Sequence, residues 1–278
     1  MIKVVSGGIS RLAHALRDGD QFAARVDGRR PAVFLDYDGT LTPIVDRPED
    51  AVISDAMRNA VRRLAQRTTV CVVSGRDRSM VADWMGIDGL VVAGSHGFDI
   101  GGDTGEQPYE VTGFEDVLAA VIDRLRTEMQ SVPGAAVEPK RFSVAVHYRL
   151  VDPALRPQVT EVVDRLLADH PDQLKLTPGK MVYEIQPKVD WDKGRAVQYL
   201  REALGVDGPG FVSLYLGDDI TDEDAFKALR GPINGIGVIV ADVDDPEVAG
   251  RETAADFVLE SIGEVERFLN TLAQTSEP

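Results

Sequence analysis

Short apolar runs alternate with helix-like patterns over much of the chain. Runs at residues 32–35, 70–73 and 90–93 are separated by amphipathic helical spacing at residues 55–67 and 77–85. Alternation of this kind is typical of parallel strands that are joined by crossover helices. The first part of the chain is therefore predicted to form a parallel sheet with helices packed on it.

The middle of the chain has a different rhythm. It contains the order helix-strand-strand twice, at residues 114–129, 135–137 and 142–148 and again at residues 153–168, 173–176 and 181–185. A weak internal duplication of this kind predicts an α+β domain with an open sheet and two helices on one face. We interpret it as an insertion.

The alternating pattern resumes after the insertion. Its elements are a helix at residues 192–204, a strand at 212–216, a helix at 224–229, a strand at 238–240 and a last helix at 264–272. The predicted fold class is therefore α/β. A Rossmann-like parallel-sheet core at residues 29–110 and 187–278 carries an inserted α+β cap domain at residues 111–186.

The N-terminal segment is predicted as a helical lead-in over residues 1–28. Leu12, Leu16, Phe22 and Val26 follow helix-like spacings, although Gly19 interrupts the pattern.

Composition narrows the class of protein. Hydrophobic residues make up 44% and charged residues 27% of the 278 residues, which is ordinary for a soluble globular chain. The formal charge of −16 argues against nucleic acid and anionic membranes as partners, because both are polyanions. An anionic small substrate would need a local cation. Nothing in the composition indicates an oligomeric state.

The single cysteine and the first residues help to predict the cellular compartment of the protein. Cys71 lies in the apolar run at residues 70–73, so neither an intrachain disulfide nor a cysteine zinc site is possible. The first ten residues contain no continuous apolar stretch, and no later window approaches a membrane span. We therefore predict a cytoplasmic protein.

The first candidate site follows the first strand of the core. The apolar run at residues 32–35 leads directly into Asp36, Asp38 and Gly39. Ligands of open parallel sheets bind outside the carboxyl ends of the strands, where both acids are expected. An Asx turn closed by Gly39 would explain the polar residues, but not two acids at the end of a buried strand.

The strand at residues 212–216 also ends in acids, among them Asp218 and Asp222. Acids in the first turn of a helix are stabilised by the helix macrodipole, and Thr221 with Asp224 resembles a capping arrangement. So many carboxylates nevertheless repel one another unless a cation joins them, and Mg²⁺ prefers a few carboxylate oxygens together with phosphate and water. Neither acid run has the glycine at the sixth position of a calcium-binding EF-hand loop. The two runs together predict a site for a hard metal ion.

Two further polar residues lie at the ends of predicted elements. Ser74 follows the run at residues 70–73, where its hydroxyl and nearby backbone N–H groups could hold a phosphate oxygen. Lys193 lies near a helix start and could supply a cation. Taken singly, a Ser-Gly turn and a solvated lysine are the commoner explanations.

The four segments, in this order and at strand ends, resemble the haloacid dehalogenase superfamily of phosphotransferases. The matching motifs are DYDGTLT at residues 36–42, VVSGR at 72–76, DKG at 192–194 and GDDITDED at 217–224. The resemblance implies that Asp36 is the nucleophile, Asp38 the general acid and base, and Ser74 and Lys193 the phosphate holders. It also implies a Mg²⁺ cofactor held by Asp36, Asp38 and Asp218, with Asp222 as an outer-shell metal partner.

The implied chemistry suits these residue types. A carboxylate that attacks a negatively charged phosphoryl group needs Mg²⁺ and Lys193 to neutralise the charge. An aspartyl-phosphate on Asp36 splits hydrolysis into two displacements. Asp38 would donate a proton to the leaving oxygen and then accept one from the attacking water.

Further segments resemble the trehalose-6-phosphate phosphatases within this superfamily. They are GSHG at residues 94–97, VEPK through HYR at 137–149 and GKMVYE at 179–184. The resemblance implies a phosphorylated disaccharide as the substrate and an inserted domain that binds its sugars. The candidate substrate contacts are Arg76, His96, Glu138, Lys140, His147, Arg149, Lys180 and Glu184. Gln186 departs from the arginine that the family is expected to carry before the proline.

Other interpretations stay open on the residues alone. An exposed antiparallel sheet face carries polar residues without any ligand. A related capped phosphatase for sucrose 6-phosphate or mannosyl-3-phosphoglycerate would share the same core. A metabolite sensor that has lost catalysis is disfavoured, because Asp36 and Asp38 are both present. We predict a Mg²⁺-dependent phosphatase that hydrolyses trehalose 6-phosphate in trehalose biosynthesis.

Overall fold

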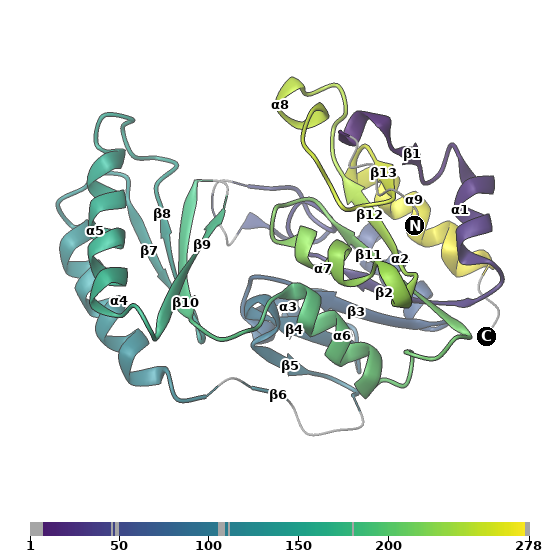
Figure 1. The fold of residues 1–278 in the computed structure, drawn as a ribbon, viewed down its shortest axis with the longest axis horizontal. Coiled ribbons are helices and arrows are strands. Elements are labelled where there is room, and N and C mark those ends of the chain that lie inside the picture. The colour runs from purple at the N-terminus through teal and green to yellow at the C-terminus, as the bar shows by residue number, and fades with distance from the viewer. Residues whose placement is uncertain are drawn as a thin grey trace. The chain divides into compact units, whose positions relative to one another are not determined.

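The computed structural model describes residues 8–45, 47, 50–104, 109–110, 112–179 and 181–275, with the backbone alone at 109, 110 and 178. The chain divides into two compact units (Figure 1). One consists of Met1–Pro108 and Trp191–Pro278, and the other of Tyr109–Asp190. The junctions thus follow residues 108 and 190, against predicted junctions after residues 110 and 186.

The central sheet has the strand order β1-β13-β12-β11-β2-β3-β4-β5-β6. The strands are β1 (Ala13–His14), β2 (Arg30–Leu35), β3 (Thr69–Val73), β4 (Val91–Gly94), β5 (Asp99–Gly101), β6 (Tyr109–Glu110), β11 (Phe211–Gly217), β12 (Ile236–Val240) and β13 (Phe257–Leu259). Neighbours from β1 to β4 along this order are parallel, whereas β5 pairs antiparallel with β4. The predicted parallel-sheet core is confirmed.

The order of the strands creates a switch point between β2 and β11. From β2 the chain proceeds outward to β3 and β4, whereas after the insertion β11 pairs with the other side of β2 and leads to β12 and β13. Leu35 pairs with Leu216 in this register, so the carboxyl ends of β2 and β11 are adjacent. Open parallel sheets bind ligands at such a point.

Helices cover both faces of this sheet. They are α1 (Gly19–Val26), α2 (Asp55–Ala65), α3 (Arg78–Met85), α6 (Lys193–Ala203), α7 (Asp222–Ala228), α8 (Pro246–Ala249) and α9 (Ile262–Thr275). Side chains of α2, α3 and α9 share one apolar cluster with Val33 and Leu216. Tyr215 points to the other face, where its ring meets that of Phe226 on α7 edge to face. The hydrophobic runs of the strands are thereby buried on both sides.

The predicted helical lead-in is only partly helical in the described part, which begins at residue 8. The helix α1 starts at Gly19, and β1 pairs with β13 near the other end of the chain. Ile9 N–H donates to Arg251 C=O at 3.1 Å. Periodicity did not indicate this pairing, because it depends on a strand that is distant in sequence.

The smaller unit contains a four-stranded antiparallel sheet in the order β7-β8-β10-β9. The strands are β7 (Ala136–Pro139), β8 (Val144–His147), β9 (Leu174–Gly179) and β10 (Val182–Pro187). The helices α4 (Glu115–Met129) and α5 (Arg156–Asp169) lie on one side of this sheet (Figure 1). Val144, Val146 and Ile185 pack with both helices. The strand residues between them belong to the open face of the sheet.

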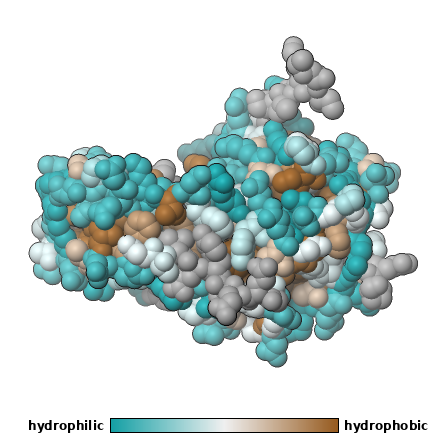
Figure 2. Space-filling model, turned by 60° about the horizontal axis from the view of Figure 1, so that its bottom comes forward, coloured by the Kyte–Doolittle hydropathy of each residue, from teal (hydrophilic) through white to brown (hydrophobic). Residues whose placement is uncertain are grey.

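The hydropathy of the surface agrees with the high charge of the chain. Figure 2 shows mainly hydrophilic residues on the face drawn, as expected for a chain with a formal charge of −16. Among the described residues, no helix has the length and hydropathy that a membrane span requires.

The core of the smaller unit can be tested with a matched pair of substitutions. Leu125 on α4 is fully buried, whereas Leu150 is 72% exposed. We expect Leu125→Ala to lower the free energy of unfolding by about 2–5 kcal/mol, because it leaves a cavity. Leu150→Ala should change it by about 0.5 kcal/mol or less. Denaturant unfolding measures both, and equal losses would contradict the described packing.

Candidate active site

Asp36 and Lys193 form a buried ion pair at the switch point. Asp36 directly follows β2, and its N–H donates to Leu216 C=O on β11 at 2.9 Å. Lys193 is the first residue of α6, and its Nζ donates to Asp36 Oδ1 and to Asp222 Oδ1, both at 2.7 Å. Asp36 is 4% and Lys193 3% exposed. The two predicted catalytic residues are therefore in direct contact.

Asp218 and Asp222 complete an acidic cluster beside this pair. One carboxylate oxygen each from Asp36, Asp218 and Asp222 lies within 4.8 Å of the others. The backbone N–H groups of Asp218 and Asp219 donate to Asp222 Oδ2, each at 2.9 Å. Tyr215 on β11 donates its hydroxyl to Asp222 Oδ1 at 2.6 Å.

The backbone between the acids leaves room for Asp218. Gly39 has a φ of +78°, and a Cβ atom added there would lie 2.2 Å from Asp218 Oδ2. Glycine is therefore required at this position for two reasons, namely the left-handed backbone and the close approach of the carboxylate.

The electrostatics of the cluster follow from burial. Burial raises the pKa of Asp36 well above its ordinary value, and the charge of Asp222 adds to the shift while Lys193 opposes it. Burial, Asp36 and Asp222 raise the pKa of Asp218 in the same way. Burial alone would lower the pKa of Lys193, but Asp222 and Asp36 raise it above its ordinary value. The neighbouring acids thus favour the charged form of Lys193, whereas Asp36 and Asp218 take up a proton more readily than ordinary aspartates.

A divalent cation fits this arrangement. Carboxylate oxygens are the ligands that hard cations prefer, and a bound cation would offset the burial and the like charges that raise the pKa values of Asp36 and Asp218. The carboxylate of Asp38 is not in the cluster.

Asp38 is instead held by Arg76. The guanidinium donates from Nε to Asp38 Oδ2 and from Nη2 to Asp38 Oδ1, both at 2.7 Å. It also lies over the ring of Trp84, 5.0 Å from the ring centroid. The fork geometry and the aromatic contact fix the orientation of Asp38.

Ser74 and His96 adjoin this pair. Ser74 is buried after β3, and its Oγ accepts the N–H of Arg76 at 3.2 Å. His96 N–H donates to Ser74 C=O at 2.8 Å, and a Cβ atom on Gly75 would lie 2.7 Å from the imidazole. His96 has a φ of +58°, a strained conformation for a residue with a side chain. Such strain is often found at functional sites.

The smaller unit brings together a second group of predicted residues. Lys140 Nζ lies 3.0 and 2.9 Å from the two carboxylate oxygens of Glu184, and Ser143 donates to Glu184 Oε1 at 2.5 Å. His147 Nε2 and Glu138 Oε2 are 2.7 Å apart. Burial alone would raise the pKa of Glu138, but the hydrogen bond from His147 and the charge of Lys140 lower it.

These pairs belong to the open face of the sheet. Glu184 lies opposite Ala145 on β8 and alternates with Tyr183 and Ile185, which pack toward the helices. Arg149, another candidate substrate contact, lies in a turn beyond the end of β8 and not on the strand that carries His147. Lys180 lies outside the described residues.

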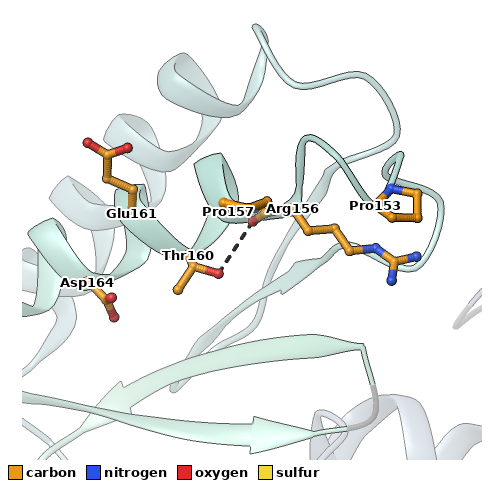
Figure 3. A pocket seen from close by; sticks show the side chains of 6 residues that line it. All are labelled: Pro153, Arg156, Pro157, Thr160, Glu161 and Asp164. Carbon is orange, nitrogen blue, oxygen red and sulfur yellow. Dashed lines mark hydrogen bonds between the residues drawn. The ribbon is translucent and has the colours of Figure 1, made fainter.

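A hollow on α5 is separate from these residues. It is lined by Pro153, Arg156, Pro157, Thr160, Glu161 and Asp164 (Figure 3). None of the predicted site residues lines it, and α5 covers the face of the sheet opposite to Glu184. We therefore do not assign it to the candidate site.

Sequence reasoning missed two hydroxyl donors of the site, Ser143 and Tyr215. Each donates to an acid that had been selected, namely Glu184 and Asp222. Strand alternation places Tyr215 on the face of the sheet opposite to Leu214 and Leu216, but it does not identify the partner of the hydroxyl.

Comparisons with known proteins agree with this geometry. A family model described as trehalose-phosphatase matches residues 34–261. A trehalose 6-phosphate phosphatase of Zea mays is 40% identical over 274 residues, covering 93% of this chain and 74% of the relative. The structure of a C. albicans trehalose-6-phosphate phosphatase C-terminal domain aligns with a TM-score of 0.75 at 23% identity, covering 94% and 98% of the two chains.

The fold is also shared by a solved structure that is described as another kind of hydrolase. A haloacid dehalogenase-like hydrolase from Bacteroides thetaiotaomicron aligns with a TM-score of 0.63 at 17% identity, covering 88% of this chain and 100% of the other. At this identity the likeness concerns the fold. It agrees with the superfamily that the four motifs indicated.

The approach of Asp218 to Gly39 predicts the effect of one methyl group. Gly39→Ala should displace Asp218 and weaken Mg²⁺ binding by about tenfold or more, because the carboxylate leaves its place in the cluster. Calorimetric titration with Mg²⁺ measures this. Gly205→Ala is the matched control, since Gly205 has a φ of +63° but nothing within 4 Å of an added Cβ. If both variants bound Mg²⁺ like the parent, Asp218 would not be a ligand.

Proposed function

We propose that this chain, which belongs to the trehalose-phosphatase family, hydrolyses trehalose 6-phosphate to trehalose and phosphate through an aspartyl-phosphate on Asp36. Members of this family are phosphoric monoester hydrolases. The observation that carries the mechanism is the buried contact of Asp36 with Lys193, beside Asp218 and at the carboxyl ends of β2 and β11. We assign the reaction to trehalose biosynthesis and to the cytoplasm.

Asp36 acts as the nucleophile in this proposal. One of its oxygens forms a bond to phosphorus while the bond from phosphorus to the sugar oxygen breaks. Lys193 supports the attack, because its charge favours the ionised form of Asp36 and can also balance the phosphoryl oxygens. The hydroxyl of Ser74, at the end of the neighbouring strand β3, is assigned to a phosphoryl oxygen.

Asp38 moves the proton in both displacements. It donates a proton to the departing sugar oxygen, and it takes one from the water that then attacks the aspartyl-phosphate and releases Asp36. Both oxygens of Asp38 are engaged by Arg76, so one of them must be released for this transfer. We therefore assign Arg76 to the orientation of Asp38, in addition to its predicted contact with substrate.

The cation in this proposal is Mg²⁺, held by Asp36 and Asp218. It would supply positive charge to the phosphoryl group and to the acids. Burial, with the neighbouring carboxylates as a further cause, raises the pKa values of both acids, and a cation beside them would favour their ionised forms, which supports this assignment.

The sugar rings are assigned to the open face of the sheet in the smaller unit. Glu184, Lys140, Glu138 and His147 are held there in ion pairs, and carboxylate, ammonium and imidazole groups are of the kinds that bind sugar hydroxyls. This part of the proposal distinguishes trehalose 6-phosphate from small phosphate esters, which offer the core the same phosphoryl group.

Removing the nucleophile tests the covalent mechanism. Asp36→Asn keeps the size of the side chain but cannot form the aspartyl-phosphate, so we expect turnover to fall by about 10⁴-fold or more with the fold retained. Single-turnover assays with trapping of phosphorylated protein, with the parent as the positive control, measure the loss. Release of phosphate near the parental rate would exclude covalent catalysis by Asp36.

Removing a sugar contact tests the substrate. Glu184→Ala should lower kcat/KM for trehalose 6-phosphate by about tenfold to a hundredfold, because a hydrogen bond to a charged group is lost. Hydrolysis of p-nitrophenyl phosphate should barely change. The control is Glu161→Ala, an exposed acid on α5 of the same unit. Equal losses on both substrates would assign Glu184 to structural support instead of sugar recognition.

A further inference from the structure

The carboxylate of Asp222 accepts four hydrogen bonds. Lys193 Nζ and the Tyr215 hydroxyl donate to Oδ1, and the N–H groups of Asp218 and Asp219 donate to Oδ2. A carboxylate has about four acceptor positions, so these donors fill all of them. Asp222 is also fully buried. Its oxygens are near Asp36 and Asp218, yet no acceptor position is left for a cation.

The four donors give Asp222 a structural task in the site. It holds Lys193, the cation that contacts Asp36 among the described residues, and it binds the backbone N–H of Asp218. Three of the donors belong to the motifs at residues 192–194 and 217–224, namely Lys193 and the backbone N–H groups of Asp218 and Asp219. The fourth, Tyr215, precedes these acids on β11 and has no role in the mechanism described above.

Packing and one hydrogen bond fix the side chain of Tyr215. Its side chain is fully buried on the face of the sheet that α6 and α7 cover, and its ring meets that of Phe226 at 5.7 Å between centroids. The ring alone would serve packing. The hydroxyl adds a bond of 2.6 Å to the oxygen that also accepts Lys193. Without it, Asp222 Oδ1 would be free to draw Lys193 away from Asp36.

We propose that Tyr215 is a positioning residue for the phosphatase reaction, and that it acts through Asp222. Its hydroxyl occupies one acceptor position of Asp222, so that Lys193 stays shared with Asp36 and the Asp218 backbone keeps its bond to Oδ2. Asp222 itself positions groups in this assignment and is not a direct cation ligand. The inference rests on the proposed function for its kinetic readout, whereas its cation-binding readout is independent of the substrate.

The test compares Tyr215→Phe with the parent in three measurements. We expect kcat to fall by about tenfold to a hundredfold for both trehalose 6-phosphate and p-nitrophenyl phosphate, because the change lies in the core chemistry. KM should change less than kcat. The dissociation constant for Mg²⁺, measured by calorimetry without substrate, should rise, because Asp218 is held less firmly.

Ser213→Ala is the matched control, because it also removes one buried hydroxyl from β11. Ser213 is 2% exposed, and its Oγ accepts from Arg201 Nε at 2.7 Å instead of contacting an acid of the cluster. Both variants should lose thermal stability, but Ser213→Ala should keep the parental Mg²⁺ affinity and kcat. If Tyr215→Phe lost stability alone, with kcat and Mg²⁺ affinity like those of the parent, the positioning role would be overturned.

A double-mutant cycle tests the claim that Tyr215 acts through Asp222. In an Asp222→Asn background, adding Tyr215→Phe should reduce kcat and Mg²⁺ affinity less than it does in the parent, because the partner is already altered. Full additivity would overturn the claim. If the parent hydrolysed p-nitrophenyl phosphate but not trehalose 6-phosphate, the proposed substrate would fail, while the ester and the Mg²⁺ titrations would still decide the role of Tyr215.

Discussion

The burial of several like charges at one point constrains the rest of the catalytic unit. Asp36 and Asp222 are almost inaccessible to water and share a single ammonium group, that of Lys193. A buried carboxylate is costly unless donors replace its hydration. The site meets this requirement with backbone N–H groups, one lysine and one tyrosine hydroxyl around Asp222. The shortage of positive charge around Asp36 and Asp218 is what makes the cluster suited to a cation.

The same constraint explains the small residues in the motifs. Atoms added at Gly39 or Gly217 would overlap the carboxylates of Asp218 and Asp222, at 2.2 and 2.3 Å. A chain that must pass this close to its own acids has no space for a side chain. The glycines thus allow the carboxylates to lie close to the backbone and to one another. The hydrogen-bond donors offset the cost of burying these carboxylates.

The two units use charge in different ways. In the larger unit, the carboxylates of Asp36, Asp218 and Asp222 lie close together, and Lys193 pairs with the first and the last of them. A further cation would therefore stabilise this cluster. In the smaller unit Lys140 is paired with Glu184 and His147 with Glu138, so the open sheet face presents compensated groups. Compensated pairs offer directional hydrogen bonds without strong attraction for any ion, which suits neutral hydroxyl groups. In the proposed function, phosphoryl transfer is therefore assigned to the larger unit and sugar binding to the smaller one.

The sequence by itself indicated most of the longer strands and helices and the acids of the site, because both depend on local patterns, but it did not indicate short edge strands such as β1 and β5. Hydrophobic periodicity located strands such as β2 and β11, and the polar residues at their ends followed directly. Only the tertiary structure decided which groups meet. Asp36 and Lys193 are 157 residues apart, and the contacts of Arg76 with Asp38 and of Tyr215 with Asp222 depend on how strands and helices pack. Long-range pairing and mutual electrostatics are properties of the packed chain, and no local pattern encodes the number of donors that reach one carboxylate.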